Sequence, residues 1–197
     1  AAYTKSLFAC DVLDRVHAAG ALYLAAPEVL DVGAKNFEAA PGLYLAARTL
    51  GGGEGLVPRL TGVEIDAYPI YRNLHSRADA AAYYLGLLPG EHRYLPGDIR
   101  RHTGRYGLIT WFFPFLTASP LLWWGLPSRY LAPEATFRHV LGLLAPGGTL
   151  VTVNYANEEA QIQRELYRDA GMLPWDTTCE DLVGRAGQPL YISAART

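Results

Sequence analysis

Short apolar runs alternate with amphipathic stretches along this chain, an order typical of βαβ units and a parallel sheet. The continuous apolar run at 108–113 suits a strand that helices cover on both faces. Strands are predicted at 28–32, 60–66, 93–95, 108–113 and 149–154. Glycines and a proline then precede a further apolar run, so residues up to 194 should end the sheet in an antiparallel hairpin.

Helical periodicity occupies the intervals between the strands. Residues 4–24 should form a helix before the first strand, and a short helix at 41–50 opens with proline and stops at Gly51-Gly52-Gly53. A longer helix is expected to start at Pro69. Its buried face would comprise Tyr71, His75, Ala78, Ala82 and Leu85. Two more helices are expected, one carrying Phe137, Val140, Leu141 and Leu144, the other at 158–172.

These elements predict an α/β fold: a doubly wound, mostly parallel seven-stranded sheet with helices on both faces and a C-terminal antiparallel hairpin. The 197 residues fit one domain, with a helical extension at 1–26 and the sheet-forming core at 27–197.

Composition narrows the setting and the partners. No apolar run is long enough to span a bilayer, and the N-terminal residues lack a signal-peptide pattern. Two distant cysteines suggest a cytoplasmic protein with reduced thiols. A net charge of −2 gives no reason to expect a nucleic-acid or anionic-membrane partner. Lys5 and Lys35 are the only lysines beside many arginines, which suits a GC-rich, bacterial genome; nothing indicates the oligomeric state.

Carboxylates stand at the ends of three successive predicted strands. Asp31 is followed by Gly33, Glu64 ends the second strand, and Asp98 follows the third. Ligands of open α/β sheets bind outside the carboxyl ends of the strands, so these side chains should share one rim. One Asp alone would suggest turn chemistry, but three aligned carboxylates favour a ligand site. Asp66 either contacts the ligand or helps the next helix to start.

In order and spacing, these segments resemble the class I S-adenosylmethionine-dependent methyltransferases. The resemblance spans residues 28–197. It rests on five segments: Leu30-Asp31-Val32-Gly33, Thr61-Gly62-Val63-Glu64-Ile65-Asp66, Gly97-Asp98-Ile99, Tyr106-Gly107-Leu108-Ile109-Thr110 and Leu144-Ala145-Pro146-Gly147-Gly148-Thr149-Leu150. It implies a Rossmann-like methyltransferase domain with S-adenosylmethionine as cofactor. Glu64 would hold the ribose, and Asp98 would lie near the adenine. The implied cofactor-binding residues are Asp31, Gly33, Lys35, Glu64, Ile65, Asp98 and Ile99.

The glycine-rich loop departs from the family pattern, because Lys35 and Phe37 stand where glycines are expected. Either side chain would crowd the methionine part of the cofactor, or Lys35 would pair with the cofactor carboxylate.

Other catalytic classes lack their motifs. The Gly-x-Gly-x-x-Gly turn of dinucleotide enzymes is missing after the first strand, as are a Gly-Lys-Ser/Thr phosphate loop and a Gly-x-Ser-x-Gly elbow. The histidines and cysteines show no zinc-ligand spacing, so no metal is expected.

The acceptor side is expected beyond the fourth and fifth strands. Residues 114–130 form either an apolar wall over a pocket or ordinary packing, and Glu158 is a candidate base or a helix cap. The basic cluster around Arg100 is expected to be a solvated edge. The substrate-side candidates are Trp111, Pro114, Trp124, Asn154 and Tyr155.

Two functions follow. The first is a methyltransferase acting on a small-molecule or peptide-like substrate. The second is a methyltransferase-like protein that has lost catalysis and binds a ligand or partner. Neither the acceptor nor the methylated atom can be derived from the sequence.

Overall fold

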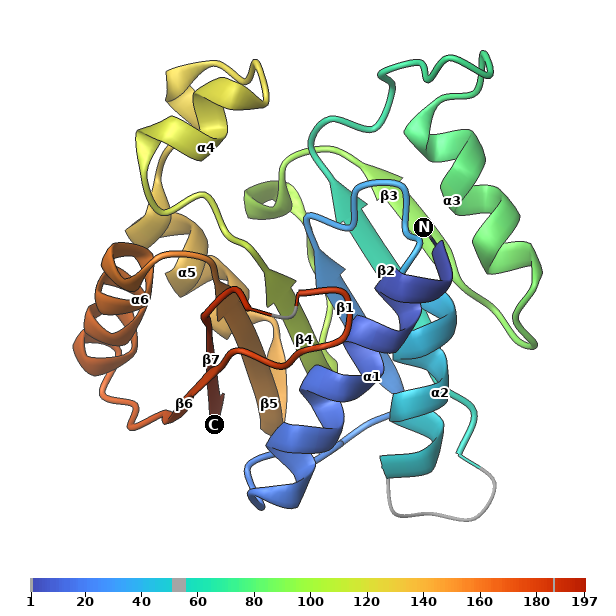
Figure 1. Ribbon diagram of the computed structural model, residues 1–197. Helices are drawn as coiled ribbons and strands as arrows, with labels where there is room; N and C mark the ends of the chain where they lie inside the picture. The colour runs from blue at the N-terminus through green and yellow to red at the C-terminus, as the bar shows by residue number, and fades with distance from the viewer. Residues whose placement is uncertain (1, 51–55, 186) are drawn as a thin grey trace.

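A seven-stranded sheet forms the centre of the computed structural model, which describes residues 2–50, 56–185 and 187–197 (Figure 1). The strand order is β3-β2-β1-β4-β5-β7-β6, and all strands are parallel except β7, which pairs antiparallel with both neighbours. The strands are β1 (Glu28–Val32), β2 (Arg59–Glu64), β3 (Arg93–Pro96), β4 (Tyr106–Phe112), β5 (Leu144–Asn154), β6 (Trp175–Cys179) and β7 (Leu190–Arg196). The predicted fold class and the C-terminal hairpin are therefore confirmed.

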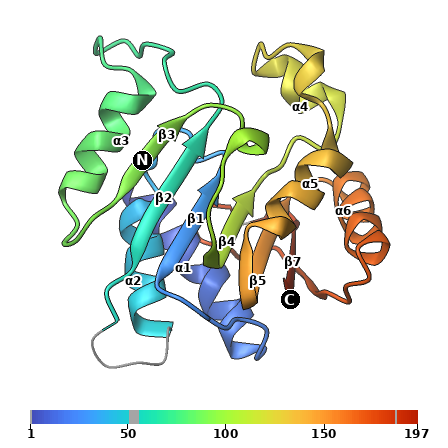
Figure 2. The same ribbon diagram turned by 180° about the vertical axis from the view of Figure 1, so that it is seen from behind.

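Helices cover both faces of the sheet, which gives three layers (Figures 1 and 2). One face packs against α1 (Ala2–Ala18), α2 (Ala40–Leu50) and α3 (Arg77–Gly86), and the other against α5 (Pro133–Gly142) and α6 (Asn157–Asp169). A short helix, α4 (Ala118–Trp123), and the 3₁₀ turns η1 (Ile99–Arg101) and η2 (Ser128–Tyr130) complete the elements. None of the helices in the described ranges combines the length and apolar character needed to cross a bilayer.

The start of the third main helix corrects a sequence prediction. Helix α3 begins at Arg77 instead of Pro69, because Ser76 caps it: Ser76 Oγ accepts the N–H of Asp79, and the Asp79 carboxylate accepts the N–H of Ser76. Tyr71 and His75 therefore precede the helix. Its buried residue is Ala81, whereas Ala82, predicted to be buried, is exposed.

Other boundaries moved by a few residues. Strand β1 has the predicted bounds, whereas β5 begins five residues earlier, at Leu144, with an irregularity in its pairing with β4. Helix α1 ends at Ala18 instead of residue 24. The predicted stop at Gly51-Gly52-Gly53 lies outside the described residues.

Helix α1 is part of the core, because it lies directly on α2. The side chains of Phe8, Val12 and Leu13 are buried there. The approach is so close that a Cβ atom added at Gly42 of α2 would lie 2.1 Å from the carbonyl oxygen of Ser6. This packing fixes the N-terminal turns of α1 beside the carboxyl ends of the strands.

Replacing Gly42 with alanine is therefore expected to lower the free energy of unfolding by about 1–3 kcal/mol, because the added methyl group meets backbone atoms that cannot turn aside. Alanine normally stabilises a helix interior over glycine by about 1 kcal/mol, so the sign is diagnostic. Gly86→Ala in α3 is the matched control, since its added Cβ meets nothing within 4 Å. Urea unfolding followed by circular dichroism measures both; a Gly42→Ala protein as stable as the wild type would contradict this close packing.

Candidate functional site

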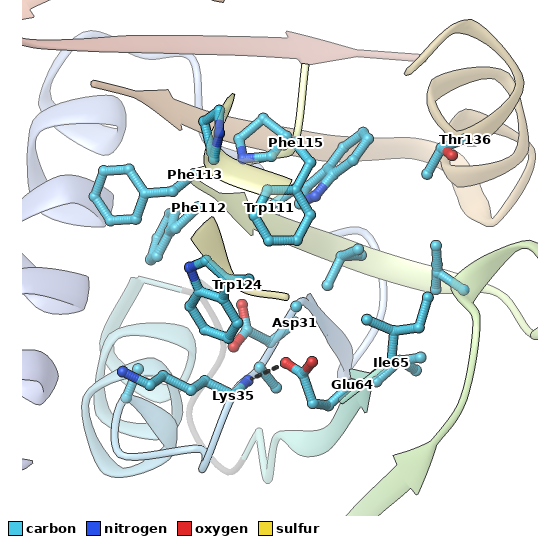
Figure 3. Close-up of a pocket in the computed structure, with 18 of the residues that line it drawn as sticks. Asp31, Lys35, Glu64, Ile65, Trp111, Phe112, Phe113, Phe115, Trp124 and Thr136 are labelled. Carbon is cyan, nitrogen blue, oxygen red and sulfur yellow. Dashed lines mark hydrogen bonds between the residues drawn. The ribbon is translucent and has the colours of Figure 1, made fainter. Parts of the chain in front are cut away.

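A cavity of about 360 Å³ opens at the carboxyl ends of β1, β2 and β4 (Figure 3). Its volume lies within the usual range of small-molecule sites. Eleven of the residues predicted for the site line it: Asp31, Gly33, Lys35, Glu64, Ile65, Asp98, Ile99, Trp111, Pro114, Trp124 and Tyr155. The carboxylates therefore share one rim, as the parallel topology predicts.

Asp31 is a buried carboxylate at the floor of the cavity. The Thr110 hydroxyl on β4 donates to its Oδ1 at 2.7 Å. Burial raises the pKa of Asp31 to about 7; the Thr110 hydrogen bond opposes this rise, and the nearby Glu64 charge adds to it. A carboxyl group with this pKa is partly protonated at neutral pH as long as no cation is bound beside it. A bound cation would favour its ionised form.

Glu64 joins two loops of the site. Its Oε2 accepts the N–H of Lys35 at 2.6 Å (Figure 3). Its Oε1 accepts the N–H of Asp66 at 2.8 Å. The side chain is buried, and it lines the cavity. Each carboxylate oxygen can accept a second hydrogen bond, so Glu64 keeps acceptor capacity for hydroxyl groups of a ligand.

The loop after β1 adopts glycine-like backbone angles without the expected glycines. Lys35 and Phe37 both have φ of 55°, and Gly33 has φ of 72°. Left-handed backbone costs a non-glycine residue roughly 1–2 kcal/mol. Burial of the Phe37 ring, which is 1% exposed, and the bond from Lys35 N–H to Glu64 offset this cost. The shape of the loop is thus retained by packing.

The two substituted side chains point in different directions. Phe37 packs in the core beside Tyr94 and does not line the cavity, so its ring leaves the ligand space clear. Lys35 does line the cavity, and its Nζ lies 5.5 Å from the centroid of the Trp124 ring. The Arg77 guanidinium lies 4.6 Å from the same centroid, and it donates to the carboxylate of Asp66. Asp66 therefore anchors the start of α3 and is not among the lining residues.

Asp98 is already engaged by its neighbour. Its oxygens accept hydrogen bonds from the backbone and guanidinium of Arg100, including one of 2.6 Å from Nη2 to Oδ2, and these bonds lower the pKa of Asp98. Arg100 lines the cavity too, which departs from the expected solvated edge. A second cavity of about 440 Å³ adjoins the first. The two cavities share the lining residues Val63, Ile65, Gly97, Asp98 and Tyr130.

Aromatic side chains form the other end of the cavity. Trp111, Phe112, Phe113 and Phe115 follow one another along and beyond β4, and Trp124 lies between them and the carboxylates (Figure 3). The segment at 114–130 does form a wall, through Pro114, Phe115, Pro120, Trp124, Leu126 and Tyr130. Trp123 takes no part in this wall and is 86% exposed.

Two predicted site residues do not reach the cavity. Asn154 is fully buried, with no hydrogen-bond partner for its amide among the described residues, and it does not line the cavity. Glu158 is exposed on α6. Its neighbour Glu159 lines the cavity, accepts the N–H of Tyr155, and has a pKa raised by burial. The sequence located the first turn of α6 near the cavity, but Glu159 lines the cavity in place of the predicted Glu158.

The sequence interpretation missed several lining residues that come from distant segments. Lys5 and Phe8 belong to α1, and Arg185 to the loop between β6 and β7. No local motif marks them, because only the folded sheet brings both chain ends to this rim. Thr110, which bonds to Asp31 without lining the cavity, could have been found from the sequence, because it lies opposite Asp31 in the register of β1 and β4.

A scan against models of protein families gives no match, and a search of curated proteins gives none. Many solved structures are similar. The 1,6-didemethyltoxoflavin-N1-methyltransferase of Burkholderia thailandensis has a TM-score of 0.61 and 16% identity, covering 99% of this chain and 80% of that one. Magnesium protoporphyrin IX methyltransferase of Synechocystis PCC 6803 with bound S-adenosylmethionine has a TM-score of 0.60 and 13% identity, covering 98% of this chain and 80% of that one. A proposed RNA methyltransferase of Pyrococcus horikoshii has a TM-score of 0.60 and 16% identity, covering 96% of this chain and 81% of that one.

The chain therefore has the fold of the class I S-adenosylmethionine-dependent methyltransferases.

Proposed function

We propose that this protein is an S-adenosylmethionine-dependent methyltransferase acting on a small-molecule or peptide-like acceptor. One observation carries the proposal: Glu64 and Asp31 line one cavity at the carboxyl ends of β1 and β2, beside a loop that keeps its left-handed shape. Two of the similar structures support a small acceptor, since they are named for 1,6-didemethyltoxoflavin and magnesium protoporphyrin IX, whereas the Pyrococcus horikoshii protein is named for RNA.

The residues fit the cofactor at several points. Glu64 would accept from the ribose hydroxyls with its spare lone pairs, and Asp31 would face the positively charged methionine end. A Cβ added at Gly33 would meet nothing within 4 Å, so the glycine leaves room beside the ligand. Lys35 is the candidate partner of the cofactor carboxylate. Ile65, Ile99 and Asp98 would surround the adenine, where Asp98 first has to share its oxygens with Arg100.

When bound, S-adenosylmethionine supplies a methyl group on a sulfonium sulfur for in-line transfer. The protein then has to align the acceptor, exclude water and, where the acceptor carries a proton, remove it. Trp111, Pro114, Trp124 and Tyr155 would form the apolar walls. Glu159 is better placed than Glu158 to act as a base, because Glu159 lines the cavity and burial raises its pKa.

The second candidate is a methyltransferase-like binding protein without turnover. This candidate is favoured by the hydrogen bonds between Asp98 and Arg100. Both carboxylate oxygens of Asp98 already accept from Arg100, and adenine recognition would need at least one of these oxygens. Binding of cofactor and transfer of methyl groups therefore have to be measured separately.

Calorimetric titration with S-adenosylhomocysteine tests the proposal most directly. We expect dissociation constants in the micromolar range, and adenosine alone should bind more weakly because it lacks the charged methionine end that Asp31 and Lys35 would face. Titration with NAD is the matched comparison, since its pyrophosphate would meet the carboxylates of the rim. Failure of S-adenosylhomocysteine to bind at millimolar concentration would rule out the methyltransferase and leave the second candidate, a protein that binds another ligand or a partner.

A further inference from the structure

The aromatic end of the cavity has a layered arrangement of rings. Phe113 and Tyr155 are stacked, with centroids 3.9 Å apart and planes inclined by 16°. Phe8 of α1 stacks on Phe113 at 5.8 Å. Phe113 has φ of 59°, an angle that bulky residues rarely adopt, so the backbone holds this ring in place at some cost. These rings come from the ends of β4 and β5 and from α1, and all of them line the cavity.

A cation completes the stack. The guanidinium carbon of Arg185 lies 5.1 Å from the centroid of Tyr155 and 5.6 Å from that of Phe113. Contact with aromatic faces fixes a guanidinium plane while its N–H groups stay available for a carboxylate. Arg185 is half-buried and lines the cavity.

Three cations, Lys5, Lys35 and Arg185, line the cavity, and Glu38 and Glu159 line it with them without pairing to these cations. Among the described residues, no carboxylate lies within 4 Å of the charged groups of Lys5, Lys35 or Arg185. Burial lowers the pKa of Lys5, the charges of Arg185 and Lys35 lower it further, and Glu38 opposes them. Groups that repel one another around a hollow would be stabilised by an anion bound between them.

Building on the proposed function, we infer that the methyl acceptor is a planar aromatic carboxylate, whose ring lies against Phe113 and Tyr155 and whose anionic group meets Arg185 and Lys5. The carboxylate-lined end of the same cavity, under β1 and β2, is left for the cofactor. The division follows the topology, since the stacked rings of Phe113 and Tyr155 follow β4 and β5, whereas Asp31, Glu64 and Asp98 stand at the ends of β1, β2 and β3.

The test compares 2-naphthoate with neutral, isosteric 2-naphthamide by calorimetry on protein saturated with S-adenosylhomocysteine. We expect naphthoate to bind about tenfold more tightly, because only it offers a charge-assisted bond to Arg185. Arg185→Gln should remove most of this preference and leave the affinity for S-adenosylhomocysteine unchanged. Arg168→Gln, an exposed position on α6, is the matched control and should keep the preference. Tyr155→Leu should weaken both probes equally.

Each outcome separates the inference from the proposed function. Equal binding of the two probes to the wild type would overturn the inference even if S-adenosylhomocysteine binds. An Arg185→Gln variant that loses S-adenosylhomocysteine would assign this arginine to the cofactor and also overturn it. The inference would also be overturned if the protein bound an oligouridylate but did not bind naphthoate. Lys5→Gln is the second variant in case Arg185→Gln fails to fold. If S-adenosylhomocysteine does not bind at all, the proposed function fails, and the same comparison without it still decides whether the anion site exists.

Discussion

Asp31→Asn is expected to have a larger advantage in stability over the wild type at pH 8 than at pH 5. Without ligand, the difference in free energy of unfolding between the two proteins should shift by about 2–3 kcal/mol in favour of the variant. The carboxyl has a pKa of about 7 in the folded protein, above its value in the unfolded chain. Between those two values the folded state holds the proton and the unfolded state releases it, so wild-type stability falls as pH rises from about 4 to about 7. The amide cannot ionise, and its oxygen can still accept the Thr110 hydroxyl.

Urea unfolding of both proteins at pH 5 and pH 8 measures this difference. Titrating groups distant from Asp31 affect both proteins alike, so their contributions cancel in the comparison. Asp169→Asn, an exposed position at the end of α6, is the control and should show no pH-dependent difference. The variant should also bind S-adenosylhomocysteine more weakly than the wild type at pH 8, where Asp31 is ionised. A stability difference that is equal at both pH values would show that Asp31 titrates normally.

Glu64→Gln is expected to weaken binding of S-adenosylhomocysteine by about 100-fold, through the loss of charge-assisted hydrogen bonds to the ribose. It should also destabilise the empty protein by about 1–3 kcal/mol, because one of the two backbone N–H groups now bound by Glu64 would face an amide NH₂ instead of an oxygen.

A ligand lacking one hydroxyl separates these two effects. The wild type should prefer S-adenosylhomocysteine to its 2′-deoxy analogue, whereas Glu64→Gln should discriminate far less between them. A variant that is merely less stable would bind both ligands more weakly and keep the preference. Glu165→Gln, an exposed position on α6, is the control for the loss of one negative charge.

The rim of acids could be predicted because it depends on topology alone. A run between a proline and a glycine fixed the bounds of β1, and parallel strands had to bring Asp31, Glu64 and Asp98 to one edge. The start of α3 was predicted wrongly because a proline at 69 was preferred to the Ser76–Asp79 capping box.

The aromatic end could not be predicted, since its parts are remote in sequence. Arg185 and Phe8 meet the same ring, that of Phe113, although most of the chain separates them. Which of Glu158 and Glu159 faces the cavity depends on the rotation of α6 about its axis, and the turn before the helix decides this. Neither feature leaves a local pattern.

The Phe37 ring also constrains a residue on another strand. A Cβ added at Gly62 of β2 would lie 2.7 Å from Cε1 of Phe37 and 2.9 Å from the Cβ of Ala34. Positions 37 and 62 are thus coupled: an aromatic ring in the loop is compatible only with a glycine beneath it. A phenylalanine at position 37 therefore depends on the glycine at position 62, and relatives with a larger residue at 62 should carry a smaller one at 37.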